Sequence, residues 1–174
     1  MKKINAGFTL IELLTTLSIA AVLGMIATPH FSAMLQDYRI KTATRLLQAD
    51  LTLARSEAIK TRQTAMLCQS SDGQHCDNTL QWQQGWLLFI DANDNSQHDA
   101  NEAIVHRASA IPYVRINAAN FLHKISYYAD GRSNNNGTFN LCNTSGTAAL
   151  LFSRSLIIAK TGRARMDKTA HYCG

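Results

Sequence analysis

The stretch that decides the fold is Phe8–Thr28, FTLIELLTTLSIAAVLGMIAT, in which Glu12 is the one charged residue. As a helix this run would be about 31 Å long, close to the roughly 30 Å hydrocarbon core of a bilayer. Lys2 and Lys3 precede it, and positive charge before a span keeps that end in the cytoplasm. The sequence therefore predicts a single membrane span with the rest of the chain on the outer side.

A secretory signal peptide is the alternative interpretation of this segment. Signal peptides have an apolar region of about 7–15 residues followed by a small-x-small cleavage site. The run here is longer, and Pro29 and His30 follow it in place of such a site. We therefore expect the apolar segment to stay in the mature protein.

Glu12 needs an explanation, because a carboxylate in an apolar span costs on the order of 2–3 kcal/mol. It could reach the lipid headgroups from a position near the interface, or it could serve a specific partner. The motif Gly7-Phe8-Thr9-Leu10-Ile11-Glu12 resembles the prepilin peptidase site of type IV pilins and type II secretion pseudopilins. The resemblance implies cleavage between Gly7 and Phe8, N-methylation of Phe8, and pairing of Glu12 with the N-terminal amine of a neighbouring subunit.

The helix is predicted to continue beyond the apolar segment. Apolar residues recur at helical spacing at Ile40, Ala43, Leu47, Leu51, Ala54 and Ala58. We expect one helix from Phe8 to about Thr61, kinked at Pro29 where a backbone hydrogen bond is lost. The predicted organisation is a cleaved leader at 1–7, a transmembrane and filament-core helix at 8–35, an amphipathic helix at 36–62, and a β-rich head at 63–174 with a basic C-terminal tail.

Short strand-like runs separated by turn residues follow the helix. The predicted strands are Thr64–Cys68, Gly85–Asp91, Ala103–Arg107, Val114–Ala118, Lys124–Tyr128, Thr138–Cys142, Ala149–Ser153 and Ser155–Lys160. Because no helical pattern separates them, they predict an antiparallel sheet in an α+β head. The segments Leu53–Ile59, Gly85–Asp91, Phe139–Cys142 and Arg154–Arg165 resemble the GspH/FimT group of minor pilins and pseudopilins. That resemblance implies the type IV pilin-like fold.

Composition and motifs exclude several classes of protein. With 46% hydrophobic and 17% charged residues in 174 positions, the chain is neither disordered nor collagen-like. The six histidines are scattered, and no G-x-S-x-G, H-E-x-x-H or phosphate-loop motif is present. The sequence therefore predicts a protein that is not an enzyme and needs no cofactor.

All four cysteines lie in the part predicted to be outside the cytoplasm, where an even number indicates two disulfides. Three pairings are possible. We predict Cys68–Cys76, which closes a small loop, and Cys142–Cys173, which ties the C-terminal tail to a strand. A zinc site using His75 and Cys76 is the alternative, but the spacing of the cysteines lacks the pattern of zinc ligands.

The segment Asp91–Glu102 has two interpretations. Asp91, Asn93, Asn95, Asp99 and Glu102 occupy positions 1, 3, 5, 9 and 12 of an EF-hand-like calcium loop. Ser96 replaces the expected glycine, however, and predicted strands flank the segment in place of helices. We favour a hairpin turn rich in residues that tolerate left-handed conformations, with no metal. A melting temperature that calcium leaves unchanged would exclude the calcium site.

The basic residues gather in the C-terminal part of the chain. The whole chain has a net charge of +5, and residues 106–174 contain nine basic and two acidic residues. If the tail is extended, Arg163 and Arg165 point to one face about 7 Å apart, and arginine binds phosphate bidentately. An alternative is a charged strand edge that prevents aggregation.

The motif Gly162-Arg163-Ala164-Arg165 resembles the G-R-x-R pattern of DNA-binding FimT-like minor pilins. The resemblance implies a minor pilin that captures extracellular DNA for uptake in natural transformation. Arg163 and Arg165 would make the primary contacts, supported by Arg154, Lys160 and Lys168. Its partners would be prepilin peptidase, the inner membrane before assembly, other pilins or pseudopilins through the N-terminal helix, and DNA.

Two alternatives remain open. One is a GspH-like minor pseudopilin of type II secretion, whose head binds other pseudopilins and secreted protein. The other is a minor pilin that primes pilus assembly and needs no DNA. All three imply an inner-membrane protein with a cytoplasmic N-terminus and a periplasmic head, later assembled into a pilus or pseudopilus.

Overall fold

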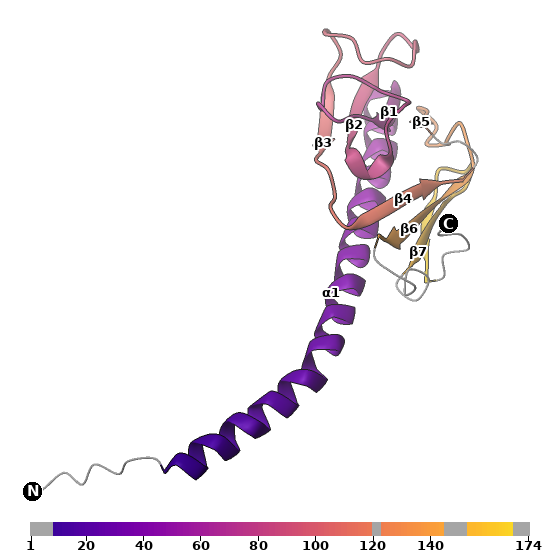
Figure 1. The fold of residues 1–174 in the computed structure, drawn as a ribbon. Helices are drawn as coiled ribbons and strands as arrows, with labels where there is room; N and C mark the ends of the chain where they lie inside the picture. Colours follow the sequence, from indigo (N-terminus) through magenta and orange to yellow (C-terminus); the bar gives the residue numbers. More distant parts are fainter. Residues whose placement is uncertain (1–8, 120–122, 145–152, 169–174) are drawn as a thin grey trace, which may run out of the picture. The chain divides into compact units, whose positions relative to one another are not determined.

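The computed structural model describes residues 9–119, 123–144 and 153–168, without the side chains of residues 26–30. One helix, α1 (Leu10–Thr61), precedes the strands (Figure 1). The strands and one short helix are β1 (Thr64–Gln69), η1 (Trp82–Gln84), β2 (Trp86–Asp91), β3 (Ile104–Ala108), β4 (Val114–Ala118), β5 (Lys124–Tyr127), β6 (Gly137–Asn143), β7 (Arg154–Ile158) and β8 (Ala164–Asp167). This α+β arrangement confirms the predicted fold class.

The chain divides into two compact units, Met1–Gln36 and Asp37–Gly174; we call the second unit the head. In the first unit α1 begins after Thr9, whose side-chain oxygen accepts a hydrogen bond from the amide of Glu12 at 3.3 Å. This is N-capping, which satisfies an amide that has no partner inside the helix. The helical backbone is continuous through Pro29. Among the described residues, no helix is both long enough and apolar enough to cross a bilayer.

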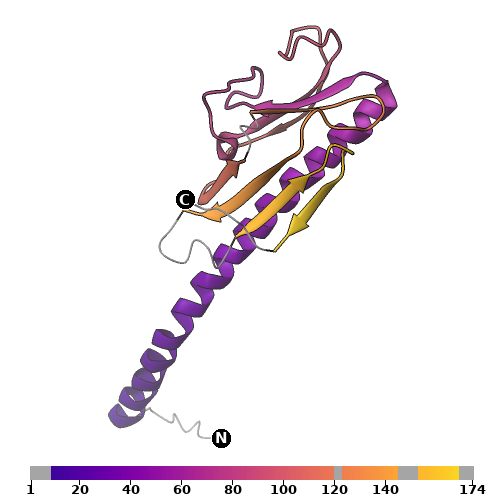
Figure 2. The same ribbon diagram turned by 90° about the vertical axis from the view of Figure 1, so that its right-hand side faces the viewer.

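Two four-stranded antiparallel sheets form the head. Their strand orders are β3-β2-β1-β5 and β4-β6-β7-β8. Seven of the predicted strands coincide with observed ones to within two residues, whereas the one predicted at 149–153 lies, except for Ser153, outside the described residues. Figure 2 shows the β6-β7-β8 end of the second sheet beside the C-terminal half of α1.

The predicted apolar stripe of α1 packs against both sheets. Ile40, Leu47 and Leu51 are at most 1% exposed and join a cluster that includes Trp86 of β2 and Leu156 of β7. Burying side chains of this size contributes about 1.5–3 kcal/mol each. Every residue of this cluster belongs to the head, which therefore has a hydrophobic core of its own.

A buried carboxylate ties the helix to the first sheet. Asp50 of α1 is 4% exposed and accepts a hydrogen bond from the indole Nε1 of Trp86 at 2.7 Å. The imidazole Nδ1 of His106 lies 3.0 Å from its other oxygen. A charged acceptor makes such a bond stronger than a neutral one, so Asp50 fixes the position of Trp86 in the core.

Candidate nucleic-acid interface

The hairpin of β7 and β8 carries the predicted DNA-binding residues. Its turn closes with two backbone bonds: Gly162 N donates to Ala159 O at 2.8 Å, and Ala159 N donates to Arg163 O at 3.1 Å. Gly162 has φ +80°, and a Cβ there would lie 1.9 Å from the carbonyl oxygen of Gly131. Only glycine fits both the left-handed conformation and this close approach. The predicted turn at Thr161-Gly162 is confirmed.

Arg163 and Arg165 are exposed on or beside β8, the edge strand of its sheet among the described residues. Arg165 lies opposite Ile157 of β7. Neither guanidinium makes a hydrogen bond or ion pair within the described residues. Both are therefore available for an anionic ligand.

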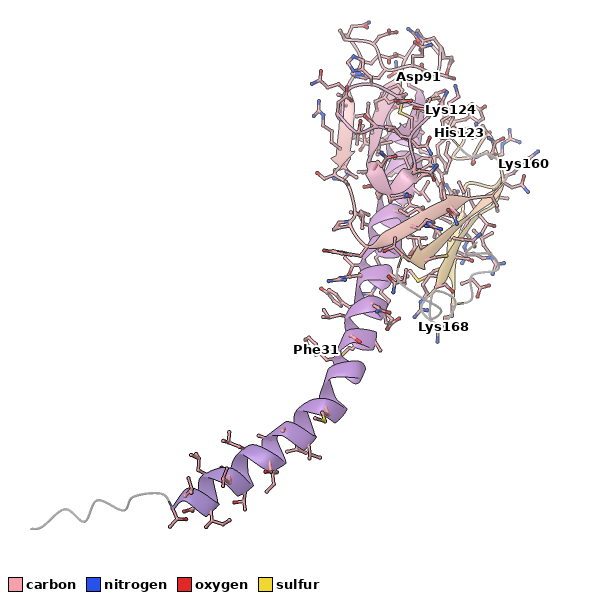
Figure 3. All side chains as sticks on the ribbon, viewed as in Figure 1. Phe31, Asp91, His123, Lys124, Lys160 and Lys168 are labelled. Carbon is pink, nitrogen blue, oxygen red and sulfur yellow. A yellow bond between two sulfur atoms is a disulfide. The ribbon has the colours of Figure 1, made fainter. Side chains whose placement is uncertain are left out.

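The two predicted supporting lysines are also exposed. Lys160 lies in the turn that joins the two strands, and Lys168 follows the end of β8, so they mark opposite ends of the hairpin (Figure 3). No side-chain ion pair is formed by either lysine in the part of the chain that the structure describes. Together with the two arginines they form what we call the basic hairpin: Lys160, Arg163, Arg165 and Lys168.

Arg154, the fifth predicted contact residue, is placed differently. Its Nη2 donates to Oδ1 of Asp37 in α1 at 2.9 Å, and its side chain is only 15% exposed. Its Nη1 donates to the carbonyl oxygen of Ser153 at 2.9 Å. Arg154 therefore joins the hairpin to the helix, and we do not include it in the basic hairpin.

The loop Asp91–Glu102 connects β2 to β3, and its two buried carboxylates accept hydrogen bonds from backbone amides of the same loop. Asp91, 1% exposed, accepts hydrogen bonds from the amides of Asn95 at 3.1 Å and Ser96 at 2.9 Å. Glu102 accepts from Ala92 N at 2.8 Å. Burial is the main cause that raises the pKa of Asp91, and the charge of Glu102 adds to it. Among the described residues, no three His, Cys, Asp or Glu side chains are placed to hold a metal ion.

The structure contains the predicted disulfide between Cys68 at the end of β1 and Cys76. Cys142 on β6 is also disulfide-bonded. Cys173, its predicted partner, lies outside the described residues.

An apolar groove of about 500 Å³ in the head was not predicted. Tyr38 and Leu46 of α1 line one side, and Ile111 and Tyr113 of the β3–β4 connection line the other. The guanidinium of Arg39 lies 4.4 Å from the centre of the Tyr113 ring. The sequence offers no signal for this groove, because Tyr38 and Tyr113 on its two sides are 75 positions apart and only folding brings them together.

Comparison with known proteins identifies the family. Residues 43–162, well over half of the chain, match the family model described as type II transport protein GspH. This chain belongs to the GspH family. Residues 2–28 of this GspH-family protein match the prokaryotic N-terminal methylation motif. No curated protein matches the chain.

Solved structures show the same fold. The type IV minor pilin FimU of Pseudomonas aeruginosa has 20% sequence identity and a TM-score of 0.60, over 77% of this chain and 99% of FimU. The minor pseudopilin EpsH from the type II secretion system of Vibrio cholerae has 10% identity and a TM-score of 0.52, over 75% of this chain and 97% of EpsH. At these identities the likeness concerns the fold alone.

The GspH family and the methylation motif together make the chain a prepilin-type minor pilin or pseudopilin. Such proteins are structural, which confirms the prediction that the chain is not an enzyme. The methylation motif implies processing by prepilin peptidase and assembly with other pilin-like subunits.

Proposed function

We propose that this GspH-family protein is a minor pilin of a type IV pilus that binds extracellular DNA for uptake in natural transformation. The observation that carries the proposal is the pair of exposed guanidinium groups, Arg163 and Arg165, with no acidic partner in the described part of the head. Phosphate contacts supply most of sequence-independent DNA binding, and arginine binds phosphate bidentately.

The geometry of the hairpin suits a nucleic-acid strand. Side chains two positions apart on one strand project to the same face about 7 Å apart, which matches the spacing of successive phosphates along a DNA strand. The turn held by Gly162 and the paired strand β7 fix the backbone before DNA arrives. A fixed backbone loses less conformational freedom on binding.

We propose the following processing and location. Prepilin peptidase cleaves between Gly7 and Phe8, and Phe8 is then methylated. The mature helix anchors the protein in the inner membrane, with a cytoplasmic N-terminus and a periplasmic head, before assembly. In the filament Glu12 pairs with the N-terminal amine of the adjacent subunit, because an isolated charge in an apolar filament core is costly.

A DNA titration tests the proposal. A soluble head beginning at Gln36 is titrated with a fluorescent duplex at several salt concentrations, together with Arg163→Ala/Arg165→Ala. Each phosphate contact contributes a slope of about −0.9 in log K against log salt, so the double variant should lose about two contacts. Equal binding by the variant would show that this site assignment is wrong, and absence of binding at low salt would refute DNA binding altogether.

The alternative role of the two arginines, protection of an edge strand, needs a variant of its own. Arg163→Glu/Arg165→Glu keeps charge on the edge of β8 and so retains its resistance to strand pairing. The same variant repels phosphate. We expect it to remain monomeric and to bind DNA more weakly than the alanine variant; a monomer that binds DNA as well as the natural head would favour edge protection.

A second function, a minor pseudopilin of type II secretion, is favoured by the groove between Tyr38 and Tyr113. Apolar exposed surface of this kind is a common subunit contact. Substitution of Tyr113 by Ser should then impair assembly or secretion without changing DNA binding. A role limited to priming pilus assembly predicts that filaments are lost while the head shows no affinity for DNA.

A further inference from the structure

The turn that follows β5 lies against the turn of the basic hairpin. Ser133 N donates to Lys160 O at 3.0 Å, and Tyr128 N donates to Arg132 O at 2.9 Å. Three backbone segments, at Tyr128, Arg132–Ser133 and Lys160, therefore lie side by side. At about 4.8 Å between neighbouring segments, the backbone of Tyr128 is about 10 Å from that of Lys160.

Tyr128 and the two arginines of the basic hairpin point away from the core of the head. Successive side chains of extended backbone point to opposite faces. Tyr127 belongs to the core cluster, whereas Tyr128, which follows it, is 44% exposed. On β8, Ala164 packs against the same cluster, whereas Arg163 and Arg165 on either side of it are exposed. The tyrosine ring and both guanidinium groups are therefore open to a ligand on the outside of the head.

The side chain of Tyr128 has no partner within the described residues. It makes neither a hydrogen bond nor a ring contact there. The other two exposed tyrosines of the described residues, Tyr38 and Tyr113, line the apolar groove. Tyr128 lies instead next to the basic hairpin. Exposed aromatic rings beside cations are typical of surfaces that bind single-stranded nucleic acids.

The acidic residue of the turn after β5 does not oppose an anionic ligand. Oδ2 of Asp130 lies 2.6 Å from Nε of Arg132, so the two charges of this turn balance. Lys160 and Arg163 of the adjoining turn form no ion pair in the described part of the head. The surface beside the Tyr128 ring is therefore positively charged, and a nucleic-acid strand can be held there by its phosphates.

A single strand and a duplex differ in what they offer to Tyr128. In a duplex the faces of the bases stack on one another, and a side chain cannot reach them. In a single strand a base can stack on an exposed aromatic ring. The cations of the basic hairpin attract the phosphates of both forms, whereas the ring of Tyr128 adds affinity for the single strand alone.

We propose that Tyr128 stacks on an unpaired base of a DNA strand whose phosphates are held by Arg163 and Arg165, which makes single-stranded DNA the favoured ligand. The inference rests on the proposed DNA-binding function and names the form of DNA that the site takes. At about 7 Å between successive phosphates, the strand passes from Lys160 to Tyr128 within one or two nucleotides.

The test uses the full chain in zwitterionic detergent micelles and three labelled probes of equal length: a thymine single strand, a strand without bases, and a duplex. We expect the thymine strand to bind about five- to tenfold more tightly than the strand without bases, at the lower end of the range for base–aromatic stacking. It should also bind more tightly than the duplex. Tyr128→Leu should abolish the advantage of the thymine strand, whereas Tyr128→Phe should keep it.

Two readouts separate stacking from a general effect on the surface. Tyr128→Leu should leave the salt dependence of binding unchanged, because the ring contacts no phosphate. The ring protons of Tyr128, assigned by the loss of their NMR signals in Tyr128→Phe, should move to higher field with the thymine strand and not with the strand without bases.

Tyr113→Leu is the matched control, because it removes an exposed tyrosine from the groove and not from the surface beside the basic hairpin. It should change the affinity for none of the three probes. Melting temperatures of all variants establish that each is folded at the temperature of the titration.

The outcomes distinguish the inference from the function on which it rests. If Arg163→Ala/Arg165→Ala weakens DNA binding while Tyr128→Leu does not, the inference is wrong and the proposed function stands. A duplex that binds at least as tightly as the thymine strand would likewise overturn the inference alone. If the natural chain binds none of the probes at low salt, the proposed function is wrong and the inference with it.

Discussion

The contact between Gly162 and Gly131 gives a quantitative prediction for Gly162→Ala. Alanine in a left-handed conformation costs roughly 1–2 kcal/mol, and Gly162 has φ +80°. The new Cβ would also lie 1.9 Å from a backbone oxygen, so one turn must move by about 1 Å. Crowding of this kind costs typically about 1–3 kcal/mol. The sum is a loss of about 2–5 kcal/mol in the free energy of unfolding.

Gly73→Ala is the matched control, because Gly73 also has a left-handed backbone, φ +68°. The atom nearest to its ideal Cβ is the Cδ of Arg107 at 2.9 Å, part of a flexible and exposed side chain that can move aside. The Nε of Arg107 also donates to the carbonyl oxygen of Gly73 at 2.7 Å. The control should therefore lose the conformational part, about 1–2 kcal/mol, and at most about 0.5–1.5 kcal/mol more if this exposed hydrogen bond breaks. The difference between the two variants is then a lower bound on the cost of the backbone clash.

Urea unfolding of the head, followed by fluorescence of the buried Trp82 and Trp86, measures both variants. We expect Gly162→Ala to unfold at clearly lower urea than Gly73→Ala, with the same dependence of free energy on urea concentration. Two variants of equal stability would show that the turn relaxes freely, and the reasoning about a fixed contact between the turns at Gly131 and Gly162 would then be wrong.

Three further predictions concern buried polar groups. Burial raises the pKa of Tyr127 to about 12. The free energy of unfolding should therefore keep its full value below about pH 10, where the unfolded chain also holds the proton, and fall by about 2–3 kcal/mol as the pH rises to 12. Tyr127→Phe should remove this loss in denaturant titrations from pH 8 to 12, and an unchanged loss would contradict the prediction. Arg154→Met removes the ion pair with Asp37 and should lower the free energy of unfolding by about 1–3 kcal/mol. The salt dependence of DNA binding should stay unchanged; a weaker dependence would show that Arg154 does contact DNA. Asp50→Ala should cost about 1–3 kcal/mol and shift the emission of Trp86, whose Nε1 loses its acceptor; an unshifted spectrum would argue against this bond.

Most of the secondary structure was predictable because local patterns specify it, although β8 (Ala164–Asp167) was not among the predicted strands. Residues 114–118 were predicted as a strand with the bounds that the structure gives, since buried Val114 and Ile116 alternate with exposed Arg115. The stripe along α1 identified the buried face of the helix for the same reason. In both cases the spacing of apolar residues follows the period of the element.

The site was only partly predictable, because its contacts join distant positions. Arg154 and Arg163 look alike in a basic tail, yet Arg154 pairs with Asp37, which lies 117 positions earlier. Sequence periodicity describes one element at a time and carries no information on which helix residue faces which strand. Arg55 lies off the apolar stripe of α1, and nothing local shows that the turns at Gly131 and Gly162 pack against its side chain.

The two candidate functions use separate surfaces of one head, and this separation makes them independent. The basic hairpin consists of Lys160, Arg163, Arg165 and Lys168 on and beside β8, whereas the groove is formed by α1 and the β3–β4 connection. No residue lines both, and Arg39, the cation of the groove, lies over the Tyr113 ring and contributes nothing to the hairpin. A head can therefore contact neighbouring subunits through its groove and still present Arg163 and Arg165 to solvent. Assembly and DNA binding do not compete for the same side chains, so loss of one on substitution, with the other intact, assigns each function to its surface.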